Sequence, residues 1–591
     1  MSLRSIVYCI GLATFLAFSQ EAVLSDEPPL RTTAELTAQV DRLFTKWNRQ
    51  DSPGCAVGIV KGGELVYSKG FGSANLEYRI PNSPQTIFET ASFTKSVTCA
   101  CLALLMDEGK ILPDDDLRKF IPEMHQFDPP IHIADMVRCR SGLWDHISVP
   151  ILVGWENVPI TEADFFSLIC GQKTLPFKPG TEFRYSSGDY VLLGITIKRL
   201  SGLSLPEFAR RRIFEPLGMK RTFFDDNPTS IVEQRAVGHH KPRGDDWRLW
   251  RPRGSLVGGG GLNTCVEDLA AWDRNFADNK LPKGKYLDEF LREGSLLGNR
   301  YCLDADAYLK EMNPDARRDS PVGQYRGLRR RQFTGGAWGL NTAMTQFPDE
   351  GWTFICLSNC SEIASWTMNS RIADLLLASR LAPLPDRSSE LSTSDQPTVQ
   401  LSDVELREKV GAYRVKSTGQ IWRIVIRDGA LQVIDHLLDA HPLRPLSAMR
   451  FDPEGQLFYE STRFVFSRTG VNARIRLVSQ WDELNNRGQL EFENVELVEP
   501  KSDQLAQYAG QYISDELAAT YRLIVRDGQL WLRVNSRRWE QLDATVRDEF
   551  IPHIREPTDG RLIRFLRNEN DDVTGLSIDH FRVTAVRFEK R

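Results

Sequence analysis

A serine and a lysine in the S-x-x-K spacing form the first pattern in this chain with evident chemistry. Ser92 and Lys95 frame the tetrapeptide S-F-T-K, and the apolar stretch from Val97 to Met106, which stops before Gly109, predicts a buried helix there. The two side chains would share one face of that helix. Its N-terminus would aim backbone N–H groups at the serine oxygen, and burial would lower the proton affinity of the lysine. The pair therefore suits a serine nucleophile with a lysine as its base; an N-cap serine near an unrelated lysine has the same spacing.

Two later motifs contain further candidate residues. Tyr185 and Ser187 belong to the run F-R-Y-S-S-G-D-Y, which leads into an apolar stretch from Val191 to Ile197. The phenol of Tyr185 could transfer a proton, although a core tyrosine would give the same pattern. The third motif, F-T-G-G, falls on a predicted strand and by itself is also typical of a turn. It consists of Phe333, Thr334, Gly335 and Gly336.

The order of these motifs resembles that of the serine β-lactamase-like and penicillin-binding superfamily, which includes class C β-lactamases, D,D-carboxypeptidases, D-aminopeptidases and esterases. Its members have S-x-x-K, then Y-x-N, then K-T-G or H-x-G on a strand that faces the serine. Other segments match in the same order: R-C-R-S-G-L at 138–143, F-K-P-G at 177–180, E-P-L-G-M at 215–219 and G-G-G-L at 259–262. The resemblance spans roughly residues 35 to 380.

The resemblance implies a role for each matched residue. Ser92 would attack a carbonyl carbon and form an acyl-enzyme, while Lys95 and Tyr185 share the general acid and base work. Backbone N–H groups of Ser92 and Gly336 would form the oxyanion hole, and water would then release the acyl group. Neither a metal nor an organic cofactor is required. The implied substrate-binding positions are Ser187, Phe333, Thr334, Gly335 and Gly336.

Two positions depart from the family pattern. Ser187 replaces the asparagine of Y-x-N, so a shorter side chain faces the substrate amide. Phe333 replaces the lysine or histidine that helps relatives hold a substrate carboxylate, which argues against efficient β-lactamase or D,D-carboxypeptidase activity. Arg331, two positions earlier on the same strand face, is a candidate replacement. A solvated edge of three arginines at 329–331 is the alternative.

Residues 33–380 carry mixed helix and strand signals and predict a single catalytic domain. Two predicted hairpins lie near its ends. One spans Cys55 to Tyr67, and the other joins a strand from Asn341 to Phe347 to a strand that ends at Leu357. Strands at both ends with helices between them favour one sheet assembled from distant segments. The predicted fold class is α/β, a mixed antiparallel sheet plus a helical region of β-lactamase/transpeptidase type.

The C-terminal third of the chain repeats itself. After a predicted linker at 381–403, rich in Pro, Ser and Asp, residues 404–498 and 503–591 match at a constant offset, for example Tyr413 with Tyr512 (512 − 413 = 99). Alternating apolar and polar residues around Asp-Gly turns predict two all-β, barrel-like modules. Among the resembling proteins, D-aminopeptidase-like members carry two such C-terminal barrels.

The start of the chain and its overall charge bear on location and partners. Arg4 followed by an apolar run from Ile6 to Phe18 predicts a signal peptide over residues 1–25, and hence export to the periplasm or medium; a buried N-terminal helix is the alternative. No later run is long enough to predict an integral membrane segment. A net charge of −5 gives no reason to expect nucleic acid or an anionic membrane as partner.

Cysteine usage adds little to this picture. Nine cysteines would follow the signal peptide (10 − 1 = 9), and their spacing predicts no zinc site. Most are expected to be small buried residues, with one or two disulfides left open.

Together these features predict an exported serine hydrolase that acts through an acyl-enzyme on a small-molecule or peptide substrate with an ester or amide bond. The alternative is a catalytically weak protein of the same fold that binds cell-wall or peptide ligands. The sequence does not define the oligomeric state.

Overall fold

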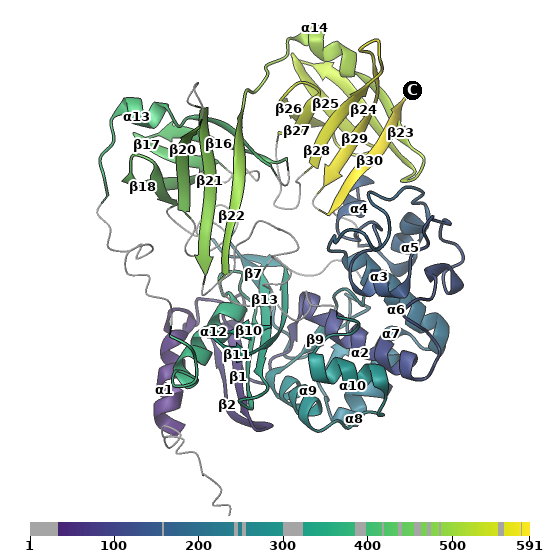
Figure 1. The fold of residues 1–591 in the computed structure, drawn as a ribbon, viewed down its shortest axis with the longest axis vertical. Coiled ribbons are helices and arrows are strands. Elements are labelled where there is room, and N and C mark those ends of the chain that lie inside the picture. Colours follow the sequence, from purple (N-terminus) through teal and green to yellow (C-terminus); the bar gives the residue numbers. More distant parts are fainter. Residues whose placement is uncertain are drawn as a thin grey trace, which may run out of the picture.

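The computed structural model describes residues 33–155, 159–241, 246–250, 256–298, 323–337, 339–383, 398–416, 419–434, 440–453, 463–469, 474–483, 486–553, 561–580 and 582–591. The predicted signal peptide, Cys302 and most of the predicted linker lie outside these residues. Figure 1 shows an α/β region, in purple to teal, with two β-barrels in green and yellow placed beside each other on one side of it.

A five-stranded antiparallel sheet organises the α/β region. Its order is β12-β13-β14-β1-β2, so strands from the two ends of the region lie side by side, as predicted. Cys55 pairs with Ser358 and Lys61 with Trp352 across the junction between β1 and β14. The strands are β12 (Arg331–Ala337), β13 (Leu340–Phe347), β14 (Trp352–Ser358), β1 (Cys55–Lys61) and β2 (Glu64–Phe71).

Helices cover both faces of this sheet. In β1, Val57 and Ile59 pack into a cluster with α1 (Thr33–Leu43) and α12 (Ser365–Leu376). Ala56 and Val60 point the other way, into the larger cluster that contains α2 (Thr94–Asp107) and α9 (Val266–Ala277). Alternate residues of a strand face opposite sides, so β1 is apolar throughout because both of its faces are buried.

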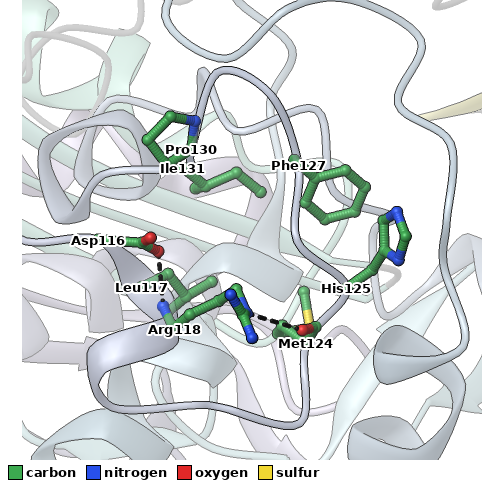
Figure 2. A pocket seen from close by; sticks show the side chains of 8 residues that line it. All are labelled: Asp116, Leu117, Arg118, Met124, His125, Phe127, Pro130 and Ile131. Atoms are coloured by element: carbon green, nitrogen blue, oxygen red, sulfur yellow. Dashed lines mark hydrogen bonds between the residues drawn. The ribbon is translucent and has the colours of Figure 1, made fainter.

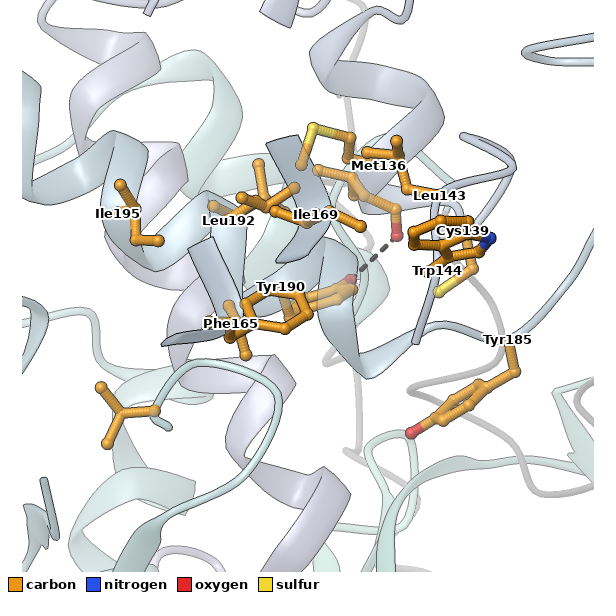
Figure 3. Close-up of a cluster of buried hydrophobic side chains, with 14 of the residues drawn as sticks. Met136, Cys139, Leu143, Trp144, Phe165, Ile169, Tyr185, Tyr190, Leu192 and Ile195 are labelled. Atoms are coloured by element: carbon orange, nitrogen blue, oxygen red, sulfur yellow. Dashed lines mark hydrogen bonds between the residues drawn. The ribbon is translucent and has the colours of Figure 1, made fainter. Parts of the chain in front are cut away.

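A helical region beyond α2 completes the α/β part of the fold. Tyr190 lies at its centre, fully buried, and donates a hydrogen bond from its hydroxyl to the carbonyl oxygen of Val137 (2.9 Å). Figure 3 shows Tyr185 at the edge of this cluster, with its hydroxyl pointing away from Cys139 and Trp144. The helices here are α3 (Ile133–Val137), α4 (Ser148–Leu152), α5 (Glu162–Cys170), α6 (Ser187–Ser201), α7 (Leu205–Ala209), α8 (Glu215–Leu217) and α10 (Lys285–Glu293).

Short strands tie the loops of this region together. One three-stranded sheet has the order β5-β9-β6 and joins the segment before Ser92 to the glycine-rich segment at 258–261. The short strands are β3 (Ser73–Asn75), β4 (Ile80–Pro81), β5 (Phe88–Glu89), β6 (Phe223–Phe224), β7 (Gly238–His240), β8 (Arg248–Trp250), β9 (Leu262–Thr264), β10 (Gln324–Tyr325) and β11 (Leu328–Arg329).

The C-terminal modules are two closed eight-stranded barrels, as the repeat predicts. Barrel 1 follows α13 (Asp403–Arg407) and contains β15 (Gly411–Val415), β16 (Ile421–Arg427), β17 (Ala430–Ile434), β18 (Ala440–Ser447), β19 (Arg450–Pro453), β20 (Arg463–Thr469), β21 (Arg474–Glu483) and β22 (Asn486–Val495). Barrel 2 follows α14 (Ser502–Leu505) and contains β23 (Gly510–Ser514), β24 (Ala519–Arg526), β25 (Gln529–Val534), β26 (Glu540–Ala544), β27 (Glu549–Pro552), β28 (Arg561–Arg567), β29 (Val573–His580) and β30 (Val583–Lys590).

The repeat extends to individual hydrogen bonds and turns. The hydroxyl of Tyr413 donates to the carbonyl of Lys409 (2.8 Å), and that of Tyr512 donates to the carbonyl of Tyr508 (2.9 Å). The Asp-Gly turns of both barrels have positive φ at each residue, for example 51° at Asp428. The constant sequence offset therefore corresponds to two copies of one structure.

The cysteines of the described residues form no disulfide, and all but the half-buried Cys170 are buried. No helix among the described residues combines the length and apolar character needed to cross a membrane.

Candidate active site

Ser92 lies at a sharp turn between β5 and α2. It belongs to a 3-10 turn, Ala91–Phe93, whose first residue has φ of 44°. Positive φ is uncommon outside glycine, and such positions cluster at functional sites. Ser92 is half-buried while its neighbours Phe93 to Lys95 are buried, so this turn presents the serine hydroxyl at the surface of the core.

Lys95 and Tyr185 both reach the serine oxygen. The hydroxyl of Tyr185 donates to Ser92 Oγ (2.6 Å), and Lys95 Nζ donates to the same oxygen (3.3 Å). Lys95 Nζ also lies 4.8 Å from the centre of the Tyr185 ring. The structure thus brings the three predicted catalytic residues into one hydrogen-bonded cluster, although Tyr185 comes from a distant loop.

Lys95 is held by two further acceptors. Its Nζ donates to Ser187 Oγ (2.9 Å) and to the carbonyl oxygen of Gly259 (2.7 Å), and its side chain is fully buried. An ammonium group can donate to each of these acceptors. Ser187, predicted to contact the substrate, therefore positions Lys95 in this structure.

The third motif lies directly beside the serine. β12 is the edge strand of the sheet, and a Cβ atom on Gly335 would meet Ser92 N at 2.9 Å and Thr90 O at 2.0 Å. Only glycine allows this close approach of two backbones. Gly336 follows as an exposed residue, and Thr334 is half-buried. The backbone N–H groups of Ser92 and Gly336 are thus on adjoining segments, as an oxyanion hole requires.

The prediction that Phe333 contacts the substrate is wrong. Its side chain is fully buried, with ring centres 5.9 Å from Phe93 and 5.6 Å from Phe276. It supports the turn at Ser92 from behind instead of contacting a substrate.

Both predicted alternatives for Arg331, a substrate contact and a solvated edge, are also wrong. Arg331 shares a strand face with Phe333, as predicted, but that face points into the protein. Its guanidinium donates to the carbonyl of Arg292 (2.8 Å) and lies 5.5 Å from the ring centre of Phe276. Arg331 is buried, so it is neither a substrate contact nor part of a solvated edge, and burial lowers its pKa to about 10.

Asp145 is a site residue that the sequence analysis missed. Its carboxylate accepts hydrogen bonds from the backbone N–H groups of Ser187 (2.7 Å) and Ile147 (3.0 Å), so it fixes the start of α6 beneath Lys95. Burial by itself would raise its pKa, but the charge of Arg582 and these N–H groups hold the pKa of Asp145 below its usual value. The only sequence signal was its place two residues after the S-G-L segment.

Arg582 is the second missed residue, and it comes from barrel 2. Its Cζ lies 4.5 Å from the ring centre of Tyr185, and its Nη1 lies 3.7 Å from Asp145 Oδ2. The ring of Tyr185 therefore has two cationic groups near it, Lys95 and Arg582.

A small hollow elsewhere in the α/β region does not belong to this site. Figure 2 shows its lining, in which Arg118 donates to the carbonyl of Met124 and Asp116 accepts from the backbone N–H of Arg118. The lining residues are Asp116, Leu117, Arg118, Met124, His125, Phe127, Pro130 and Ile131, which include none of the serine cluster. Among the described residues no group of His, Cys, Asp and Glu side chains is arranged to hold a metal.

Comparison with known proteins places this geometry in context. Residues 37–377 match the family model described as Beta-lactamase. A D-aminopeptidase of Gluconobacter oxydans is 31% identical over 252 residues, which cover 41% of this chain and 45% of the relative. A D-aminopeptidase of Brucella anthropi is 31% identical over 227 residues, or 38% of this chain and 42% of the relative. The chain therefore matches less than half the length of these relatives.

The fold is also found in solved structures. The octameric penicillin-binding protein homologue from Pyrococcus abyssi aligns with a TM-score of 0.51 at 19% identity. The alignment covers 78% of this chain and all of the other. At this identity the similarity concerns the fold.

Proposed function

Because the chain belongs to the Beta-lactamase family, we propose that it is a serine hydrolase with Ser92 as its nucleophile. The observation that carries the proposal is the convergence of Tyr185 Oη and Lys95 Nζ on Ser92 Oγ, at 2.6 and 3.3 Å. A nucleophile within hydrogen-bond reach of a base, which is itself oriented by further groups, is the arrangement that acyl transfer needs.

The contacts of Lys95 favour Tyr185 as the base. As an ammonium donor to Ser92, Ser187 and Gly259, Lys95 has no lone pair with which to accept a proton. Its charge lies 4.8 Å from the Tyr185 ring and stabilises a phenolate. With Tyr185 as the phenolate, the Ser92 hydroxyl donates to Tyr185 Oη, and its proton passes to Oη as Ser92 Oγ bonds to the carbonyl carbon.

Acylation and deacylation use the same groups in turn. The tetrahedral intermediate places its negative oxygen at the N–H groups of Ser92 and Gly336, each worth roughly 10²–10³ in rate. When the intermediate collapses, the leaving amine or alcohol takes the proton from Tyr185, and Ser92 carries the acyl group. Water then attacks the acyl carbon and gives a proton to Tyr185. As the bond to Ser92 Oγ breaks, Tyr185 returns this proton to Oγ, and the acid product leaves.

We propose an amide or short peptide as the preferred substrate class. The relatives named D-aminopeptidase support amides over β-lactams, and the buried Phe333 removes a cation that relatives use for a substrate carboxylate. The proposal also includes export, which rests on the basic and apolar pattern from Arg4 to Phe18.

The test measures turnover and intact mass with p-nitrophenyl acetate, a D-alanine p-nitroanilide and a fluorescent penicillin. We expect the anilide or the acetate to be hydrolysed, with a transient acyl adduct on Ser92. The Ser92→Ala variant should lose the adduct and about 10³-fold or more of the turnover. Ser96→Ala is the matched control, because Ser96 lies on the same helix with its hydroxyl bonded to the carbonyl of Phe93. If no reagent gives an adduct or turnover, that result contradicts the proposal and favours the ligand-binding alternative.

A further inference from the structure

The turn between β29 and β30 brings barrel 2 into contact with the serine cluster. Arg582 lies in this turn, and its side chain is only 15% exposed. Its backbone N–H contacts Ser148 Oγ (3.4 Å) at the start of α4, and Thr584, two residues on, accepts a hydrogen bond from Arg184, the neighbour of Tyr185. Contacts at Arg582 and at Thr584 therefore hold this turn beside Tyr185.

Several charged groups surround the Tyr185 ring. Lys95, from α2, lies 4.8 Å and Arg582, from barrel 2, lies 4.5 Å from the ring centre. Asp145, from the loop before α4, lies 3.7 Å from Arg582 and offsets part of its charge. Burial lowers the pKa of its neighbour His146 to about 4, so that imidazole is neutral at neutral pH. Arg184 stacks on Phe177 instead, 5.4 Å from that ring.

The sum of these charges beside Tyr185 is positive at neutral pH. Two cations and one partly shared carboxylate favour a phenolate over a neutral phenol. The strand of the third motif does not supply the second cation, because Phe333 is buried and Arg331 donates to the carbonyl of Arg292. Arg582 supplies the second cation beside Tyr185 from a different part of the chain.

We propose that Arg582 is a positioning residue for Tyr185, so that barrel 2 completes the active site. Its guanidinium packs on the ring, holds the phenol hydroxyl at Ser92 Oγ, and stabilises the phenolate that takes the proton of Ser92. The proposal rests on the proposed function, in which Tyr185 is the base. It assigns barrel 2 a part in the chemistry of a site whose nucleophile lies in the α/β region.

The first test is the pH profile of kcat/KM on the substrate that the wild-type protein hydrolyses. Arg582→Met keeps the length and apolar body of the side chain but removes its charge. We expect the rising limb of the profile to move about one pH unit higher, since an opposite charge at this distance shifts a titration by about 1–3 units. Turnover at neutral pH should fall about tenfold, and Arg582→Lys should restore most of it. A melting temperature for each variant separates this effect from a loss of fold.

Arg526→Met is the matched control. Arg526 ends β24 at the opposite end of barrel 2, and 63% of its side chain is exposed beside Asp527. The same charge is removed from the same module, so an electrostatic effect of net charge alone would appear in both variants. We expect the profile of Arg526→Met to coincide with that of the wild-type protein. An unshifted profile for Arg582→Met would overturn the proposal.

A second test needs no turnover. The titration of Tyr185 is followed by tyrosinate absorbance, as the difference between each protein and the same protein with Tyr185→Phe. We expect this titration to move to higher pH in Arg582→Met, or in Arg582→Gln if the methionine variant does not fold, and not in Arg526→Met. If the wild-type protein hydrolyses nothing, the proposed function fails, while a shifted titration still supports the role of Arg582. An unshifted titration overturns that role in either case.

Discussion

Barrels 1 and 2 are copies of one structure that have become different parts of the molecule. Both close with eight strands, and both have the tyrosine bond seen at Tyr413 and Tyr512. Barrel 1 packs around its own apolar cluster, whereas the core of barrel 2 is continuous with that of the α/β region. Figure 1 shows the ends of β29 and β30 next to α4, where this contact is made.

The difference arises from few residues at one end of the barrel. Trp422 of barrel 1 is buried in its own core, 5.2 Å from the ring of Phe492. At the equivalent position of barrel 2, the hydroxyl of Tyr521 donates to the carbonyl of Leu152 in α4 (2.9 Å). The turn that carries Arg582 also differs in length: Leu576 pairs with Phe588, whereas Leu477 pairs with Phe492, so this hairpin is three residues shorter in barrel 2 (15 − 12 = 3). A duplicated scaffold can therefore enter an active site through a strand substitution and a shortened turn while its barrel remains closed.

Breaking one buried ion pair in each region gives the largest expected contrast. Asp145 pairs with Arg582 next to the serine cluster, and Asp452 pairs with Arg463 inside barrel 1 (2.9 Å). Asp145→Ala and Asp452→Ala should each lower the free energy of unfolding by about 3–5 kcal/mol, because each removes a carboxylate that offsets the charge of a buried arginine. Only Asp145→Ala should also lower kcat, by about 10²-fold, since it displaces Ser187 and Lys95.

Urea unfolding measures the loss of stability in each variant. Steady-state kinetics without urea, where the variants are folded, measure the loss of kcat. Equal losses of kcat in the two variants would mean that barrels 1 and 2 are equally coupled to the active site, which contradicts this prediction.

The sequence predicted the serine cluster because its motifs follow one another in a known order. Ser92, Lys95, Tyr185 and Ser187 come together as that order implies. It also predicted the two barrels, because the alternation of apolar and polar residues and the constant offset are both visible in the sequence itself. Arg582 could not be predicted, since nothing in the alternation of a barrel strand indicates which end of the barrel contacts another region.

The errors at Arg331 and Phe333 have a related cause. Alternation in a strand shows which residues share a face but not what covers that face. In the structure the face of Phe333 packs against Phe93 and Phe276, so the predicted substrate contact became a core contact. Asp145 was missed because a carboxylate that accepts backbone N–H groups has no characteristic spacing in the sequence.

Mild acid should weaken the barrel 2 contact before it affects barrel 1. Burial lowers the pKa of His146 to about 4, whereas an unfolded histidine titrates near 6.5. The unfolded chain therefore binds more protons between these values, so stability is lost as the pH falls from about 6.5 towards 4. Asp145, with its pKa below the usual value, stays ionised through this window and adds a further loss at lower pH.

Hydrogen exchange at pH 7 and pH 5 measures this difference strand by strand. We expect β29 and β30 to lose protection at the lower pH while β15 and β16 keep theirs. The His146→Gln variant should remove the dependence in this window, and its persistence in that variant would exclude His146 as the cause.

The smallest expected effect isolates the hydroxyl that joins barrel 2 to α4. Tyr521→Phe removes the bond to the carbonyl of Leu152 and should lower the free energy of unfolding by about 1 kcal/mol. Tyr413→Phe removes a hydrogen bond of similar length inside barrel 1 and should lower the free energy of unfolding equally.

The two variants differ in what the lost hydrogen bond positions. Tyr521 holds α4, whose Ser148 contacts Arg582, so only Tyr521→Phe should move the pH profile of kcat/KM to higher pH. A shift of a few tenths of a pH unit is enough to separate them. Coincident profiles would show that Arg582 keeps its place without this bond, and the contact between barrel 2 and the site would then depend on Arg582 and its immediate partners alone.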